Sequence, residues 1–276
     1  MNCENLLIWN ARGLNSRARR SVVRELVAQE RFSLVTLQET KLDDCPASLV
    51  LELLGAGFDF FHLPASHTCG GILFAWHRDV WVCTTPIPRD FSLTVKLVNG
   101  ASNDEWWVTC VYGPQSDSDK IAFLDELRAI RDGCSGPWLL CGDFNLIYKA
   151  EDKNNSILNR RMMGRFRRFI DDTELQELHL NGRRFTWSNE RDNPTLERLD
   201  RVFASEDGCP YTRITSSPLL HPSVQIMPRF ASQLQHPYIV SSGFILKIFG
   251  PSLMGSCKWS RRRGFAHGGT QMPSAF

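Results

Sequence analysis

Apolar runs of strand length alternate with amphipathic helical patterns through residues 1–207, and this alternation limits the chain to a few layered architectures. Apolar residues recur at helical spacing in Asp119–Arg131 and Arg161–Asp172, whereas Trp138–Cys141 is a short apolar run typical of a buried strand. We therefore predict an α/β or α+β fold built in layers. The expected strands are Glu4–Asn10, Phe32–Leu37, Gly71–Trp76, Val80–Thr84, Phe91–Val98, Trp106–Tyr112 and Trp138–Cys141, and further helices are expected after Ser16 and over Pro46–Leu54.

The chain changes character after Asp207, its last acidic residue. Residues 1–207 carry 25 basic and 30 acidic side chains, whereas residues 208–276 carry seven basic and no acidic ones. No hydrophobic period is sustained beyond residue 207, and Pro, Ser and Gly are dense there. A basic tail that binds nucleic acid would explain the bias, and so would a shift of reading frame. We predict a folded domain over residues 1–207 and an irregular tail over 208–276.

The composition excludes some classes of protein. No apolar run approaches the roughly 18–20 residues that a membrane-spanning helix needs, so we expect no membrane partner. The N-terminal apolar run, residues 6–9, is too short for a signal peptide. Nine cysteines are an odd number, and none forms a C-x-x-C pair. We expect reduced thiols, with Cys134 and Cys141 unpaired, in a nuclear or cytoplasmic protein.

Gly142-Asp143-Phe144-Asn145 directly follows the buried run Trp138–Cys141. A glycine there lets the backbone turn, and the two polar side chains stand two residues apart at the end of a strand. One carboxylate and one amide at a sheet edge suit a divalent cation and a phosphate oxygen. An Asx-rich turn without chemistry has the same pattern, so these four residues alone leave both interpretations open.

Four further polar residues end or follow other strand-like runs: Asn10, Glu39, Tyr112 and Asp200. Each is ordinary on its own, since it could be a turn residue, a surface residue, a core residue or one member of a salt bridge. Two packed sheets that end at one edge would bring them together. A hard cation held by oxygen ligands there would make hydrolysis of a phosphodiester feasible, with a carboxylate as base for water.

Seven short motifs occur in a fixed order that resembles a known family: W-N-A-R-G-L, L-Q-E-T-K, G-G-I-L-F-A-W, V-Y-G-P, G-D-F-N, F-T-W-S-N and L-D-R. This order resembles the endonuclease/exonuclease/phosphatase superfamily, and more narrowly the endonuclease domain of plant LINE (non-LTR) retrotransposon polyproteins. The resemblance runs from about Asn5 to Asp207. It implies a four-layer sandwich of two mixed β-sheets flanked by helices.

The resemblance also implies roles for individual residues. Glu39 would be the main ligand of Mg²⁺ (or Mn²⁺), and Asn10 would help bind the metal or a phosphate. Tyr112 would contact the scissile phosphate. The remaining roles concern the water and the supporting acid: Asp143 would align or deprotonate the attacking water, Asn145 would orient it or the phosphate, and Asp200 would support the site.

DNA is the partner that the resemblance implies. Trp187 corresponds to an aromatic residue at the rim of the site, close to nucleic acid. Arg161, Arg165 and Arg168 stand on a predicted helix and could neutralise DNA phosphates, although a solvated helix face would carry the same residues. We expect a monomer without an obligate protein partner.

The chain departs from the family pattern in two places. Arg12 stands where abasic-site repair relatives carry an Asp. The family's Ser-Asp-His-x-Pro motif is absent, and neither His221 nor His236 follows an Asp. A shift of one nucleotide permits codons for Ser-Asp-His-Ala-Pro-Val over residues 225–230 and restores acidic residues further along. We therefore expect a frameshift near residues 207–208 and the loss of the last strands.

The sequence as a whole predicts a Mg²⁺-dependent endonuclease that nicks DNA to leave a 3′-hydroxyl, derived from a LINE-type element and impaired in this chain. We find no reverse transcriptase pattern in it. Two alternatives stay open, namely a phosphatase of the same superfamily that acts on a small phosphoester, and a nucleic-acid-binding remnant without activity.

Overall fold

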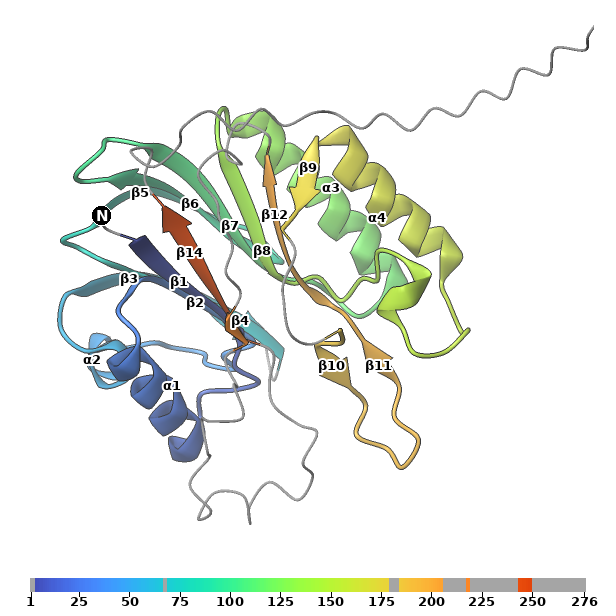
Figure 1. The fold of residues 1–276 in the computed structure, drawn as a ribbon, viewed down its shortest axis with the longest axis horizontal. Helices are drawn as coiled ribbons and strands as arrows, with labels where there is room; N and C mark the ends of the chain where they lie inside the picture. Colours follow the sequence, from blue (N-terminus) through green and yellow to red (C-terminus); the bar gives the residue numbers. More distant parts are fainter. Residues whose placement is uncertain (1–2, 67–68, 179–183, 206–216, 219–242, 250–276) are drawn as a thin grey trace, which may run out of the picture.

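Two six-stranded β-sheets pack face to face, and pairs of helices cover their outer faces (Figure 1). The structure is a computed structural model that describes residues 3–66, 69–178, 184–205, 217–218 and 243–249. Within this part of the chain, no helix is long and apolar enough to cross a membrane. The four-layer sandwich expected from the motifs is confirmed.

The first sheet has the strand order β13-β14-β1-β2-β4-β3. Strands β1 and β2 are parallel, and the other neighbours are antiparallel. Helices α1 and α2 pack on its outer face. The elements of this half are β1 (Cys3–Asn10), α1 (Arg17–Gln29), β2 (Phe32–Gln38), α2 (Ala47–Leu54), β3 (Phe58–Ser66), β4 (Cys69–His77), β13 (Ser217–Pro218) and β14 (Gly243–Phe249).

The second sheet has the order β5-β6-β7-β8-β12-β9, with β7 and β8 parallel. Helices α3 and α4 cover it, and β10 and β11 form a separate hairpin. The elements of this half are β5 (Trp81–Pro88), β6 (Ser92–Asn99), β7 (Glu105–Tyr112), α3 (Asp117–Gly133), β8 (Trp138–Asp143), the 3-10 helix η1 (Ala150–Asp152), α4 (Arg160–Asp172), β9 (Leu175–Glu177), β10 (Trp187–Ser188), β11 (Leu196–Glu197) and β12 (Asp200–Ser205).

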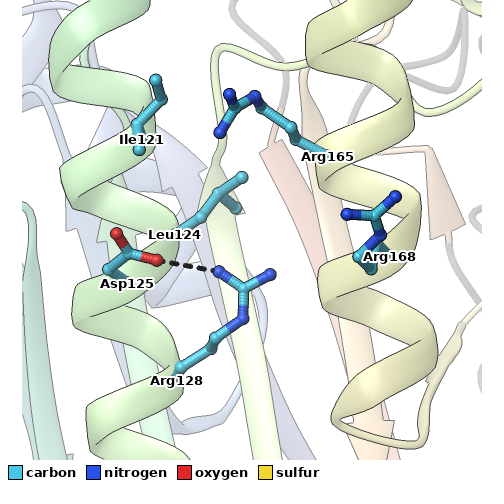
Figure 2. A pocket seen from close by; sticks show the side chains of 6 residues that line it. All are labelled: Ile121, Leu124, Asp125, Arg128, Arg165 and Arg168. Carbon is cyan, nitrogen blue, oxygen red and sulfur yellow. Dashed lines mark hydrogen bonds and ion pairs between the residues drawn. The ribbon is translucent and has the colours of Figure 1, made fainter.

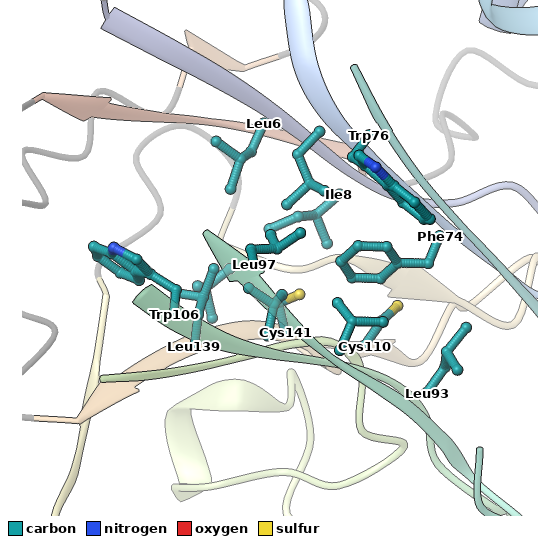
Figure 3. Close-up of a cluster of buried hydrophobic side chains, with 14 of the residues drawn as sticks. Leu6, Ile8, Phe74, Trp76, Leu93, Leu97, Trp106, Cys110, Leu139 and Cys141 are labelled. Atoms are coloured by element: carbon teal, nitrogen blue, oxygen red, sulfur yellow. The ribbon is translucent and has the colours of Figure 1, made fainter. Parts of the chain in front are cut away.

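The central strands read as continuous apolar runs because both of their faces are covered. In β8, Leu139 and Cys141 face the core between the sheets, whereas Leu140 faces the helices. In β1, Leu6 faces the inter-sheet core and Leu7 faces the layer of α1 and α2. Figure 3 shows side chains of the two sheets meeting in the inter-sheet core. Cys134 and Cys141 are buried free thiols.

The expectation for the tail is corrected over one stretch. Gly243–Phe249 forms β14, which pairs antiparallel with β1 along its length, with Ile245 opposite Leu7. Phe, Ile and Leu dominate this stretch, and aromatic and β-branched residues favour strands even in a sequence without a regular period. Pairing also gives partners to the N–H and C=O groups on that side of β1. Ser217–Pro218 forms the short strand β13 beside it. The rest of the tail, including His221 and His236, lies outside the described residues.

Candidate active site

A buried hydrogen bond joins the two sheets where β1 and β8 end. Nδ2 of Asn10, the last residue of β1, donates to Oδ2 of Asp143, the last residue of β8, at 2.8 Å. Both side chains are at most 5% exposed. The two residues are 133 positions apart in the chain, so packing of the sheets is what brings them together.

Tyr112 and Asp200 flank Asp143 on the two neighbouring strands. Tyr112 ends β7 and lies opposite Asp143 in the parallel pair, and Asp200 begins β12 and lies opposite it in the antiparallel pair. Residues in register share a face of the sheet, and Tyr112 packs against the inter-sheet core. The backbone N–H of Asp200 donates to Oγ1 of Thr186, which fixes the start of β12. The structure thus brings three of the predicted residues side by side.

The turn after β8 holds the Asp143 carboxylate in place. Gly142 has φ +129°, and a Cβ there would lie 2.2 Å from the carbonyl oxygen of Val111, so only glycine fits. The N–H of Asn145 donates to Oδ1 of Asp143 at 2.9 Å, and the Asn145 side chain donates to the carbonyl of Gly113 at 2.6 Å. The Asx turn and the site are therefore the same feature, because the turn orients the carboxylate.

Glu39 follows β2 in a left-handed conformation with φ 51°. The N–H of Gly13 donates to its carbonyl at 2.7 Å, and Nζ of Lys41 lies 3.0 Å from its Oε1. Arg12, Lys41 and Asn145 are left-handed as well. Such conformations are costly for residues other than glycine and persist where surrounding contacts enforce them, commonly at functional sites.

The Asp143 carboxyl is buried without full compensation of its charge. Burial raises the pKa of Asp143 to about 6, and the negative charge of Glu39 acts in the same direction. Hydrogen bonds from the Asn145 N–H and the Asn10 amide oppose this, as does the positive charge of Arg12. A nearby cation would stabilise the ionised form.

These side chains suit a hard divalent cation. Asn10, Glu39 and Asp143 offer only oxygen ligands, of the kind that Mg²⁺ prefers. The negative charge of Glu39 disfavours the ionised form of the buried Asp143 carboxyl, and a bound cation would relieve this effect. Among the described side chains, no three His, Cys, Asp or Glu residues cluster in a way that could hold a metal ion. The amide oxygen of Asn10, which accepts from the N–H of Arg12 at 3.1 Å, is the third oxygen group at this edge. Glu39 and Asn10 are the residues that would hold the metal.

A surface ion pair connects this edge to the hairpin that carries Trp187. Nη1 of Arg12 lies 3.3 Å from Oε1 of Glu190, which follows β10. Trp187 itself is half-buried in β10, opposite Glu197. The sequence marked Arg12 only as a departure from the family pattern. In the structure, the positive charge of Arg12 lowers the pKa of Asp143, and its side chain contacts the hairpin.

Arg161, Arg165 and Arg168 do not join this edge. They lie on α4, which packs with α3 against the outer face of the second sheet. Arg161 and Arg168 are exposed, and Arg165 is half-buried.

A buried ion-pair network near the site was missed by the sequence. Arg201, which follows Asp200 in β12, pairs with Asp152 and Glu177. Asp152 also accepts hydrogen bonds from the N–H groups of Tyr148 and Lys149. The network ties the loop after Asn145 to β12. Because its partners are far apart in the chain, no local pattern could have revealed it.

With this geometry established, the chain can be compared with known proteins. The model of the endonuclease/exonuclease/phosphatase family matches residues 7–232. The chain belongs to this family. The matched range includes all five strand-end residues of the candidate site, namely Asn10, Glu39, Tyr112, Asp143 and Asp200. A comparison with curated proteins gave no match.

Solved structures that are named as DNA-processing proteins share the fold of this chain. AP endonuclease LMAP from Leishmania major is 16% identical, with 90% of this chain and 88% of that chain covered and a TM-score of 0.66. The endonuclease domain of TRAS1, a telomere-specific non-LTR retrotransposon, is 12% identical, with 90% and 99% covered and a TM-score of 0.64. TDP2 from D. rerio, complexed with a single-strand DNA product, is 13% identical, with 91% and 100% covered and a TM-score of 0.60. At these identities the likeness concerns the fold.

Proposed function

We propose that the chain carries a Mg²⁺-dependent (or Mn²⁺-dependent) phosphodiesterase site that nicks DNA and leaves a 3′-hydroxyl. The main support for this proposal is the buried Asn10–Asp143 hydrogen bond, together with the negative charge of Glu39 that acts on the same Asp143 carboxyl. Descent from a LINE-type element is part of the proposal. It is supported by the order of the seven motifs and by the fold shared with the TRAS1 domain.

In this proposal the chain's own residues divide the work around the phosphate. Asp143, with a pKa of about 6, is ionised at neutral pH and is a stronger base than an ordinary aspartate, so it takes a proton from the attacking water. The Asn145 backbone holds this carboxylate, and Tyr112 and Asp200 flank it. When bound by Glu39 and Asn10, the cation supplies Lewis-acid stabilisation of charge on the phosphate. Trp187 contacts the nucleic acid at the rim.

We further propose that this chain is impaired. The Asp–His pair that would face the phosphate is missing from the sequence, and loss of one group that stabilises the transition state commonly slows an enzyme about 10²–10³-fold. The metal and water side of the site retains all its residues. Residues 208–276 would then derive from a shifted reading frame, which sequencing of related genomic copies around codons 205–230 would test.

Parallel assays on three substrates test the proposal: supercoiled plasmid, abasic duplex and a phosphoinositide. We expect plasmid or abasic DNA to be cut in Mg²⁺, no cut in EDTA, and loss of the cut in Asp143→Ala. Asp59→Ala, an exposed change on β3, is the matched control and should cut like the parent. Hydrolysis of the phosphoinositide alone would favour a superfamily phosphatase, and no Asp143-dependent product at all would favour a binding remnant.

A further inference from the structure

A basic hollow lies between α3 and α4, on the helical layer outside the second sheet. Figure 2 shows Arg165 projecting from α4 toward α3, where Asp125 and Arg128 stand, and Arg168 lying along α4. None of the residues in this hollow belongs to the candidate active site. Its lining consists of Ile121, Leu124, Asp125, Arg128, Arg165 and Arg168.

The three arginines differ in their ion-pair partners. Nη1 of Arg128 lies 2.9 Å from Oδ1 of Asp125, its Nη2 lies 3.8 Å from Asp172, and its guanidinium stands over the ring of Phe169. These contacts fix the position of Arg128. Neither Arg165 nor Arg168 has an ion-pair partner within the described part of the chain. Three guanidinium groups against one carboxylate leave the lining with an excess positive charge of two.

The arrangement follows from the sequence of α4. Met162, Phe166, Phe169 and Ile170 are buried against the sheet, so the arginines are left to the other faces of the helix. Arg161, Arg165 and Arg168 are spaced four and three residues apart, which places them on one stripe. With a rise of about 1.5 Å per residue, the stripe presents cations every 4–6 Å or so along the helix. A repeating anion fits such a row better than a single one.

We propose that this α3–α4 groove binds the phosphodiester backbone of nucleic acid, at a place separate from the candidate active site. The planar guanidinium donates two parallel hydrogen bonds to phosphate oxygens, and the one carboxylate in the lining, Asp125, is paired with Arg128 and not with Arg165 or Arg168. A bound phosphate would also relieve the mutual repulsion of these cations. The inference rests on the proposed function only in choosing nucleic acid, and not a phospholipid surface, as the source of the phosphates.

Binding of a short fluorescent DNA duplex, followed by anisotropy, tests the inference. The background is Asp143→Ala with EDTA present, so that cleavage does not enter the measurement. The paired change Arg165→Gln/Arg168→Gln removes the two unpartnered charges. We expect it to weaken binding about fivefold or more and to lower the slope of log affinity against log salt by about 2, since each phosphate contact contributes about 0.9.

The matched control is Arg24→Gln/Arg31→Gln, which removes the same charge from two exposed positions on the opposite side of the fold, one in α1 and one just after it. We expect the salt slope of this control to equal that of the parent. Equal slopes for the groove variant and its control would overturn the inference, because the effect would then be one of net charge. Loss of binding to phosphatidylserine vesicles, without loss of binding to the duplex, would overturn it as well.

The result can be separated from that of the proposed function. Nicking assays on the parent chain are run independently of the binding assay. If the groove variant binds DNA more weakly while the parent shows no metal-dependent nicking, the groove assignment holds and the proposed function fails. If the parent nicks DNA and the groove variant binds like its control, only the groove assignment fails.

Discussion

Asp143 has two N–H donors as its hydrogen-bond partners, from Asn10 and Asn145. Burying a carboxylate with donors but without a directly paired cation costs stability, as its raised pKa shows. A chain that needed only a stable edge here would be better served by a neutral side chain. The arrangement therefore favours a role that requires a negative charge at this position.

The first prediction concerns Glu39 as a metal ligand. We expect Glu39→Gln to slow Mg²⁺-dependent nicking about 10²–10³-fold, because a neutral amide replaces the charged ligand. We also expect added Mg²⁺ to raise the melting temperature of the parent but not that of the Glu39→Gln variant, since a ligand stabilises only a fold that binds it. Plasmid nicking and thermal melting with and without Mg²⁺ measure the two effects.

The control for this prediction is Glu25→Gln, the same change at an exposed position of α1. It should leave both measurements as in the parent. A Glu39→Gln protein that melts higher in Mg²⁺ to the same extent as the parent would remove Glu39 from the metal site.

At the scale of elements, α3 is held against the second sheet partly by Glu126. Oγ of Ser92, in β6, donates to Oε1 of Glu126 at 2.6 Å. Burial nevertheless raises the pKa of Glu126, and Asp90 adds to this, whereas the hydrogen bonds oppose it. A raised carboxyl pKa means that the charged form is disfavoured by folding, so the penalty exists above the folded pKa and vanishes as pH falls.

The second prediction follows from this pH dependence of the penalty at Glu126. We expect Glu126→Gln to melt higher than the parent at pH 8, because the amide accepts the Ser92 hydrogen bond without a buried charge. The difference should shrink as pH falls through the folded pKa of Glu126. Melting curves across that range measure it, and a difference that grows toward acid pH would contradict the assignment.

The third prediction concerns the buried network that joins η1, β9 and β12. Asp152 is 2% exposed and accepts from Arg201. We expect Asp152→Asn to lower the free energy of unfolding by up to about 3–5 kcal/mol, because the buried guanidinium of Arg201 loses one of its two carboxylate partners and keeps only Glu177. Asp59→Asn breaks the exposed pair with Arg78 and should cost less than about 1 kcal/mol. Urea denaturation of both would show equal costs if the network were not important.

Sequence patterns located the buried strands well, for a physical reason. Runs such as Trp138–Cys141 are covered on both faces, so they are apolar throughout and stand out. Strand β3 was not predicted, because Phe58–Ser66 lacks a regular period and contains Pro64. That proline is tolerated because β3 is at the edge of its sheet, where a missing N–H breaks no ladder.

The candidate site was predictable in its members and not in its contacts. Each member ends or follows a strand, which a sequence can show, and the motif order supplied their roles. The Asn10–Asp143 hydrogen bond depends on how two sheets pack, and the Arg12–Glu190 pair depends on a hairpin that no periodicity indicated. Long-range pairing of this kind has no local signature.

At the scale of the whole molecule, β14 extends the first sheet beyond β1 and lies between β1 and β13. The frameshift hypothesis expected no ordered strand from this stretch, and the pairing of β14 with β1 contradicts that expectation. The hypothesis still rests on the absence of acidic residues after Asp207 and on the codons that restore the missing motif. The two observations are compatible, because an apolar stretch can pair with an available strand whatever its origin.

The fourth prediction tests whether β14 contributes to the fold. Ile245→Pro removes an N–H from the ladder opposite Leu7, whereas Ile245→Val keeps the strand. We expect the proline variant to melt several degrees lower and to aggregate more readily, and the valine variant to behave like the parent. Identical melting of all three proteins would show that β14 does not support the sheet in solution.

The most direct test of the central claim is supercoiled-plasmid nicking in Mg²⁺ by two forms of the chain, one as written and one with its tail restored to the −1 reading frame. Each form is also made with Asp143→Ala. We expect the restored form to nick the plasmid, the chain as written to nick it at least about tenfold more slowly, because it lacks a group facing the phosphate, and neither Asp143→Ala form to nick. Mg²⁺-dependent nicking that survives Asp143→Ala in either form would contradict the assignment of the active site.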